Sequence, residues 1–173
     1  MGDLAADVRE TIRDVPDFPN DGILFKDITP VLADAELFGR VCEWMAVEYA
    51  DVDKIVAIES RGFLFGAGMV HRTGSGLVLA RKKGKLPHVT IGQEYDLEYG
   101  TATLEMHKDS INPGDRVVIV DDLLATGGTA EAAITLCKEL GAEVLGACFL
   151  IELGFLDGRK RLHGTSVTSL VNY

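Results

Sequence analysis

The chain has 173 residues, 47% of them hydrophobic, and a formal net charge of −10, so it can bury the core of one globular domain. The acidic balance argues against nucleic acid as a partner, because binding to a phosphate backbone needs a basic surface. No apolar run reaches the roughly 18 residues of a membrane helix and the acidic start MGDLAADVRE does not resemble a signal sequence, so we expect a cytoplasmic protein without a membrane partner.

The first third of the chain predicts two helices separated by an irregular segment. Apolar residues recur at helical spacing from Leu4 to Val15, and Pro16 would end that helix. The stretch PDFPNDGILF, residues 16–25, is rich in turn residues and predicts irregular backbone. A second amphipathic helix is expected after Asp34, whose carboxylate can cap its N-terminus.

The rest of the chain alternates between strand and helix patterns. Helical segments are expected near 62–72 and 128–140. Apolar, partly β-branched segments predict strands that are buried on both faces, at 54–59, 76–81, 116–121 and 143–152. This order predicts the α/β class, with an open, mostly parallel, doubly wound sheet flanked by helices in a single domain over residues 1–173.

Cysteine and histidine do not point to metal or redox chemistry. Cys42, Cys137 and Cys148 are widely spaced and lie among apolar residues, which predicts buried thiols in a reducing compartment. The four histidines are scattered without the spacing of metal ligands. We therefore expect no metal site built from protein ligands.

Three polar stretches follow three of the predicted strands. They are ESRG (59–62), RKKGK (81–85) and DDLLATGGT (121–129). In an open parallel sheet, ligands bind beyond the carboxyl ends of the strands, in the turns that lead into helices. The three stretches are therefore expected to meet in one site.

The stretch TGGT, residues 126–129, predicts an anion site. Its small side chains let backbone N–H groups approach an anion at a helix N-terminus, and a phosphate fits there. Asp121 and Asp122 would repel that phosphate, so they should face sugar hydroxyls or a magnesium ion. A phosphate beside a ribose describes a nucleotide or a phosphosugar. The structural alternative is a glycine-rich turn whose Asp pair caps a helix.

Several other phosphate and nucleophile motifs are absent from the sequence. It contains no G-x-x-x-x-G-K-[ST], and no G-x-G-x-x-G opens the first strand–helix unit. Ser60 lacks the G-x-S-x-G context of an esterase nucleophile because Ile58 stands at the first glycine position. An ATPase, a dinucleotide dehydrogenase and an esterase are therefore unsupported.

Five stretches carry a resemblance to a known family. VVIVDDLLATGGT (117–129) resembles the phosphoribosyl pyrophosphate (PRPP) signature of the type I phosphoribosyltransferases. Four further stretches resemble the adenine phosphoribosyltransferases in particular: FPNDGILFKDITPVL (18–32), ESRGFLFG (59–66), RKKGKLP (81–87) and LEYGTATLE (97–105). The resemblance implies the type I fold, a small N-terminal hood from about residues 1–33, and conversion of adenine and PRPP to AMP and pyrophosphate by a homodimer.

The resemblance also implies roles for the PRPP-binding residues. Asp121 and Asp122 would hold the ribose hydroxyls. The 5′-phosphate would lie in a turn made of Ala125, Thr126, Gly127, Gly128 and Thr129. Magnesium would bridge the ribose and the pyrophosphate with few direct protein ligands, because this ion often keeps its waters.

Cations are expected to hold the leaving pyrophosphate. The resemblance places Arg61 in the pyrophosphate loop, after a non-proline cis peptide that would join Glu59 and Ser60. The other cations, Arg81, Lys82 and Lys85, would belong to a loop that closes over the reactants, in this site or the partner subunit's. Taken alone, RKKGK is equally well explained as a solvated loop.

The catalytic step needs a carboxylate near the purine. The attacking purine must lose a proton while positive charge develops on the sugar, and one carboxylate can serve both needs. If YDLEY (95–99) is extended, Asp96 and Glu98 share a face and periodicity does not choose between them; an edge strand with two solvated acids is the alternative. The resemblance points to Glu98, supported by Tyr99.

The resemblance assigns purine recognition to GILFKD. Backbone groups near Leu24 would read the exocyclic amine, while Phe25 and Leu123 or Leu124 would form an apolar slot. Lys26 departs from the arginine that the family commonly carries, and a point charge does not replace a planar guanidinium. Two alternatives therefore stay open: an enzyme that prefers hypoxanthine or guanine, and a regulatory module that binds PRPP without catalysis.

Overall fold

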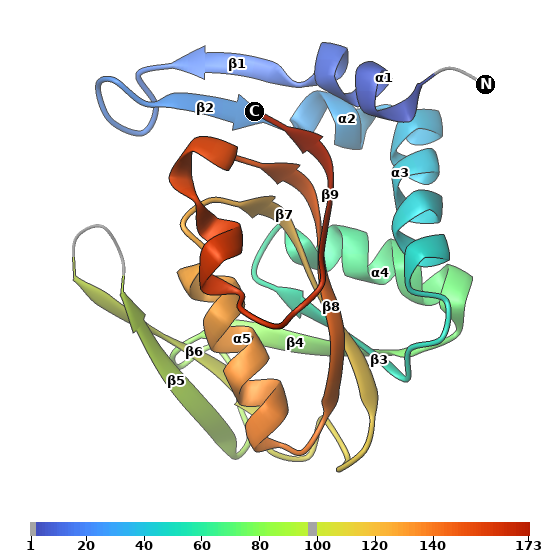
Figure 1. Ribbon diagram of the computed structural model, residues 1–173, viewed down its shortest axis with the longest axis vertical. Coiled ribbons are helices and arrows are strands. Elements are labelled where there is room, and N and C mark those ends of the chain that lie inside the picture. The colour runs from blue at the N-terminus through green and yellow to red at the C-terminus, as the bar shows by residue number, and fades with distance from the viewer. Residues whose placement is uncertain (1–2, 97–99) are drawn as a thin grey trace.

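The computed structural model describes residues 3–96 and 100–173, in which one large sheet carries helices on both faces and a separate hairpin lies at one end (Figure 1). The strand order of the sheet is β5-β6-β4-β3-β7-β8-β9. Its parallel strands are β3 (Lys54–Ile58), β4 (Gly76–Lys82), β7 (Arg116–Leu124), β8 (Glu143–Glu152) and β9 (Val167–Asn172). The predicted α/β class with a mostly parallel sheet is confirmed.

Two antiparallel strands extend the sheet beyond β4. β5 (Thr90–Asp96) pairs with β6 (Thr101–His107), and β6 pairs with the end of β4 through Arg81 and Lys82. Neither this hairpin nor β9 was predicted as part of the sheet. β5 is mostly a mixture of exposed and partly buried residues, and in β6 the fully buried Leu104 and Met106 alternate with partly buried ones, so neither strand has the continuous apolar run that identified the central strands.

The central strands are buried on both faces because helices cover both. α3 (Ala35–Glu48) and α4 (Gly62–Thr73) pack over one face, and α5 (Gly128–Glu139) packs over the other (Figure 1). In β7, Val118 and Val120 join the core beneath α3 and α4, whereas Val117 and Ile119 join the core beneath α5. This alternation explains why the strand reads as an unbroken apolar run.

The N-terminal segment corrects two predictions. The helix expected to reach Val15 ends earlier: α1 spans Leu4–Thr11, and β1 (Arg13–Pro16) follows. β2 (Leu24–Asp27) begins within the segment expected to be irregular, pairs antiparallel with β1 and places Val15 opposite Phe25. Helical spacing of apolar residues was misleading here because a pairing partner ten residues away decides the local structure.

The N-terminus of α3 (Ala35–Glu48) agrees with its predicted cap. The Asp34 carboxylate accepts hydrogen bonds from the N–H groups of Glu36 and Leu37, both at 3.0 Å, and so caps α3 as predicted. The short α2 (Thr29–Ala33) precedes it, and two 3₁₀ turns, η1 (Gly154–Leu156) and η2 (Gly158–Arg161), follow β8. Among the described helices, none is long and apolar enough to cross a membrane.

The three cysteines are free and buried, as predicted. Burial raises the pKa of Cys42 to about 11 and that of Cys137 to about 12, and it raises the pKa of Cys148 further in the same direction. These thiols therefore stay protonated at neutral pH and serve as small apolar core groups.

Candidate active site

The carboxyl ends of three strands meet at one cavity. It has a volume of about 290 Å³ and is lined by Glu59, Ser60, Arg61, Lys82, Asp121, Asp122 and Leu123. These residues lie at, or directly after, the carboxyl ends of β3, β4 and β7, which are neighbours in the sheet. The structure thus brings together side chains from all three polar stretches at the edge where open α/β sheets bind ligands.

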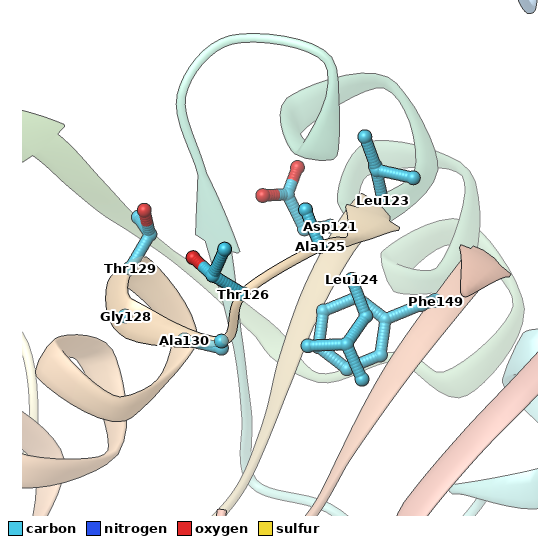
Figure 2. Close-up of a pocket in the computed structure, with 10 residues that line it drawn as sticks. Asp121, Leu123, Leu124, Ala125, Thr126, Gly128, Thr129, Ala130 and Phe149 are labelled. Atoms are coloured by element: carbon cyan, nitrogen blue, oxygen red, sulfur yellow. The ribbon is translucent and has the colours of Figure 1, made fainter. Parts of the chain in front are cut away.

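The turn between β7 and α5 forms a second, smaller cavity of about 80 Å³ beside the first. Its lining includes all of residues 123–130, together with Asp121 and Phe149. Figure 2 shows Thr126 and Thr129 on the same side of the turn as the Asp121 carboxylate, with Leu124 and Phe149 on the opposite side. Gly127 has a φ of 86°, a conformation that favours glycine, and α5 begins directly after it. The turn therefore presents hydroxyls and a helix N-terminus to a ligand over an apolar base.

An ion pair forms part of the wall of the larger cavity. The Arg61 Nε atom donates a hydrogen bond of 2.6 Å to Oδ2 of Asp122, whose residue is only 4% exposed. The backbone N–H of Asp122 in turn donates to Oδ1 of Asp121 at 2.9 Å. Gly62 allows the loop after β3 to lie this close to β7, since a Cβ at Gly62 would lie 2.7 Å from the Val120 carbonyl oxygen. The two adjacent acids thus differ: among the residues that the structure describes, Asp122 is paired with a cation and Asp121 is not.

The pKa of Asp121 lies well above its usual range. Burial is the main cause, and the negative charge of Asp122 adds to it, while Arg61 acts in the opposite direction. Keeping Asp121 ionised at neutral pH therefore costs the folded protein stability. A ligand that donates hydrogen bonds to this carboxylate would relieve that cost.

We expect Asp121→Asn to raise the stability of the ligand-free protein at pH 8. The folded-state pKa is raised, so ionised Asp121 destabilises the fold above that pKa; as the pH falls, the folded state takes up a proton and the penalty disappears. The advantage of the variant should therefore shrink between pH 8 and pH 5. Urea unfolding at both pH values measures it, with Asp51→Asn, at an exposed carboxylate, as the control. A constant advantage at both pH values would contradict this account.

The cationic stretch is tied to the loop after β3. Arg81 Nε donates to Oε2 of Glu59 at 2.8 Å, and Arg81 Nη1 donates to the carbonyl oxygen of Lys85 at 3.0 Å. The Glu59–Ser60 peptide is cis, as the family resemblance implied. Lys82 lines the cavity, whereas Lys85 is exposed to solvent. Of the three predicted cations, Lys82 is thus the one placed at the cavity wall.

The hairpin β1–β2 brings Phe25 close to Arg61. The Arg61 guanidinium carbon lies 5.5 Å from the centre of the Phe25 ring, and Phe18 packs edge-on against Phe25 at 5.1 Å between ring centres. Leu24 is 51% exposed. Of the hairpin residues expected to bind the purine, Phe25 thus lies beside Arg61.

Lys26 is held by the hairpin and by the last strand. Its Nζ atom lies 2.6 Å from Oδ1 of Asp14 and 4.0 Å from the centre of the Tyr173 ring, and its side chain is only 11% exposed. The guanidinium carbon of Arg9 lies 4.6 Å from the centre of the same Tyr173 ring. Tyr173 and Asp14 were not identified from the sequence, because a cation–aromatic contact between residues so far apart leaves no local pattern.

Glu98 and Tyr99 lie outside the described residues. The described ends of β5 and β6 adjoin the site: Tyr95 and Ala102 line a cavity with Glu59, Asp121 and Thr129. In the part of the chain that the structure describes, no group of three or more His, Cys, Asp or Glu residues could hold a metal ion.

Comparisons with known proteins identify the family of this chain. The family profile described as "Phosphoribosyl transferase domain" matches residues 32–170. The adenine phosphoribosyltransferases of Trichlorobacter lovleyi and Carboxydothermus hydrogenoformans are 52% and 54% identical to this chain over 169 residues, which is 96% of this chain and 99% of each relative.

Solved structures extend the similarity to the fold. The adenine phosphoribosyltransferase of Thermoanaerobacter pseudethanolicus superposes with a TM-score of 0.94 at 53% identity, covering 98% of this chain and 99% of that one. The Saccharomyces cerevisiae enzyme, solved with adenine and an imino-altritol bisphosphate, gives a TM-score of 0.92 at 38% identity over 96% of this chain and 98% of its own. The chain therefore belongs to the phosphoribosyl transferase family, and within it to the adenine phosphoribosyltransferases.

Proposed function

We propose that the protein transfers the 5-phosphoribosyl group of PRPP to adenine, giving AMP and pyrophosphate. The bond from ribose C1 to the pyrophosphate oxygen breaks, a bond from C1 to a purine nitrogen forms, and the purine proton passes to a base. The observation that carries the proposal is the position of the pair Asp121–Asp122. The pair shares the larger cavity with Arg61, and the turn at 125–129, a few residues further along the chain, lines the smaller cavity beside it. An acidic pair beside an anion site matches a sugar that carries a phosphate.

The ribose 5-phosphate moiety would bind along the end of β7. Backbone N–H groups of residues 126–129 would hold the phosphate at the N-terminus of α5, with the hydroxyls of Thr126 and Thr129 beside it. Asp121 would accept hydrogen bonds from the ribose hydroxyls. Asp122 would orient Arg61 through their 2.6 Å hydrogen bond as well as contact the sugar.

The pyrophosphate would lie between the loops after β3 and β4. Arg61 and Lys82 line this part of the cavity, and cations there stabilise the negative charge that grows on the leaving oxygen. Ser60 and the backbone of the cis peptide would add donors. Arg81 and Lys85 would join when the loop closes, which requires Arg81 to exchange its contact with Glu59 for one with substrate.

Magnesium fits this site as an ion carried largely by the substrate. The donor set is small: Asp122 is engaged by Arg61, which leaves the Asp121 carboxylate as the nearest anionic oxygen of the acidic pair. Such a set suits an ion that keeps several waters and binds phosphate oxygens. When bound, magnesium neutralises the charge of the pyrophosphate.

The purine would bind between the hairpin and the end of β7. Phe25 and Leu123 would contact its faces, and backbone groups at Leu24 would read the exocyclic amine. Since Lys26 is held between Asp14 and Tyr173, its replacement of arginine would affect the hairpin rather than a direct contact with the base. Glu98 would accept the purine proton and stabilise the charge on the sugar, with Tyr99 in support.

The organisation of the protein follows from the same family relationship. Residues 1–33 would form a hood over the purine, within a single domain over residues 1–173. We further propose a homodimer in the cytoplasm, in which the cationic loop reaches toward a partner subunit's site.

The test is product formation from PRPP and magnesium with adenine, hypoxanthine and guanine supplied separately. AMP formed from adenine alone supports the proposal. A product from hypoxanthine or guanine instead would replace the base assignment but keep the phosphoribosyl chemistry. No product with any base, together with tight PRPP binding, would favour a regulatory module and overturn catalysis.

A further inference from the structure

The segment after β8 packs against the turn at 125–129, where the phosphate is proposed to bind. A Cβ atom added to Gly158 would lie only 2.0 Å from the carbonyl oxygen of Ala125 and 3.0 Å from the backbone nitrogen of Gly127. The N–H of Leu153 also donates to the carbonyl oxygen of Leu124 at 2.9 Å. Figure 1 shows this segment beside the beginning of α5. The position of Gly158 therefore sets how the turn at 125–129 lies.

One ion pair anchors this segment to the sheet. Arg159 donates to Glu152 through both Nε and Nη2, at 2.9 Å to Oε1 and 2.5 Å to Oε2, and donates from Nη1 to the Val167 carbonyl oxygen at 2.6 Å. Ser169 on β9 donates to Oε2 of Glu152 at 2.6 Å. We call these contacts of Glu152 and Arg159 the clamp. It fixes the residue next to Gly158 to the ends of both β8 and β9.

The two partners of the clamp differ in burial. The carboxylate side chain is 5% exposed while Arg159 is 48% exposed, so the buried acid is the fixed point and the arginine is held onto it. The hydrogen bonds from Arg159 hold the pKa of Glu152 below its usual range, which keeps the acid ionised at neutral pH. Without Arg159, the buried charge would keep, among its partners in the described part of the chain, the Ser169 hydroxyl alone, and the segment would lose its anchor.

We infer that Glu152 and Arg159 are positioning residues for the 5′-phosphate: by pressing Gly158 against the turn, they hold its N–H groups in the geometry that binds phosphate. This inference rests on the proposed function, since the phosphate assigned to the turn is that of PRPP and AMP. Neither side chain lines the cavities at the turn or at the ion pair. Their effect therefore passes through the segment that they anchor, whose Gly158 backbone and Arg161 side chain lie against the turn.

The test compares a ligand of the turn with a ligand of the opposite loop. Ribose 5-phosphate carries the phosphate that the turn would bind, whereas pyrophosphate with magnesium would bind near Arg61. Calorimetry on Arg159→Met should show that ribose 5-phosphate binds about tenfold more weakly than to the wild-type protein, because misplaced binding groups lose affinity steeply. The affinity for pyrophosphate should stay within about twofold of the wild-type value. In turnover, KM for PRPP should rise by a similar factor and KM for adenine should not.

Two further variants keep the test decisive. Glu152→Gln removes the charge with little change of shape and should shift ribose 5-phosphate binding in the same direction, so it serves if Arg159→Met does not fold. Arg72→Met removes the Arg72–Glu43 ion pair of 2.8 Å between α4 and α3 and should leave both ligands unaffected.

The outcomes separate this inference from the proposed function. Equal weakening of both ligands, or none, together with a lowered Tm would show that the clamp serves stability alone and would overturn the inference. If the wild-type protein formed no AMP, the proposed function would fail, while selective loss of ribose 5-phosphate binding in Arg159→Met would still support the clamp.

Discussion

Glu98→Gln is expected to lower kcat about 100-fold, the lower end of the range for a lost general base. The variant keeps the size of the side chain but loses the carboxylate that would accept the purine proton and stabilise positive charge on the sugar. PRPP binding should change little, because the residues proposed to bind it lie at the ends of β3, β4 and β7. Steady-state kinetics and PRPP titration together measure the two effects.

Asp96→Asn is the matched control for this variant. Asp96 is an exposed acid at the end of β5 and is the residue that alternation alone could not distinguish from Glu98. Its amide variant should keep kcat within about twofold, as expected for a solvated surface charge. Unchanged turnover in Glu98→Gln would remove Glu98 from the mechanism, and a large loss in Asp96→Asn instead would transfer the role to Asp96.

Gly127→Ala is expected to lower kcat/KM for PRPP about 100-fold, since small displacements of binding groups have effects of this order. The residue has a φ of 86°, and a Cβ there would lie 2.5 Å from the carbonyl oxygen of Gly158. The turn would have to move away from Gly158, and its N–H groups would no longer converge on one phosphate. Initial rates at varied PRPP concentration give the value.

Gly74→Ala separates the backbone effect from the steric one. Gly74 ends α4 with a φ of 72°, but a Cβ there would meet nothing within 4 Å. Both alanine variants should lose about 1–2 kcal/mol from the left-handed backbone, whereas only Gly127→Ala should lose affinity for PRPP. If the two variants had the same kcat/KM, the turn would not be the phosphate site.

The predicted elements that agreed with the structure are those with strong local signals. The largely apolar stretch at 143–152 corresponds to β8, whose bounds are Glu143–Glu152, and Asp34 caps α3 as its side chain suggested. A strand that is buried on both faces needs apolar residues at every position, so its pattern is visible without knowing its neighbours. The order of strand, acidic pair and glycine turn likewise belongs to one continuous stretch.

The predictions that failed concern elements whose conformation depends on distant partners. Val15 has helical spacing from Leu4, but it lies in β1 because it pairs with Phe25 of β2. β9 is parallel to β8 and is only partly buried, so it has no pattern that identifies it as a strand of the sheet. In each case the hydrogen-bonding partner, not the local period, decides the structure.

The sequence by itself determined the α/β class, the acidic pair with its glycine turn, and the family to which five stretches point. Local chemistry suffices for these because each strand pattern, motif and family stretch behind them is a short run of residues. Only the tertiary structure decided that Arg61 pairs with Asp122, that Lys26 lies between Asp14 and Tyr173, and that Gly158 supports the turn. These contacts join residues that are distant along the chain, and they arise from strand order and close packing, which no local pattern specifies.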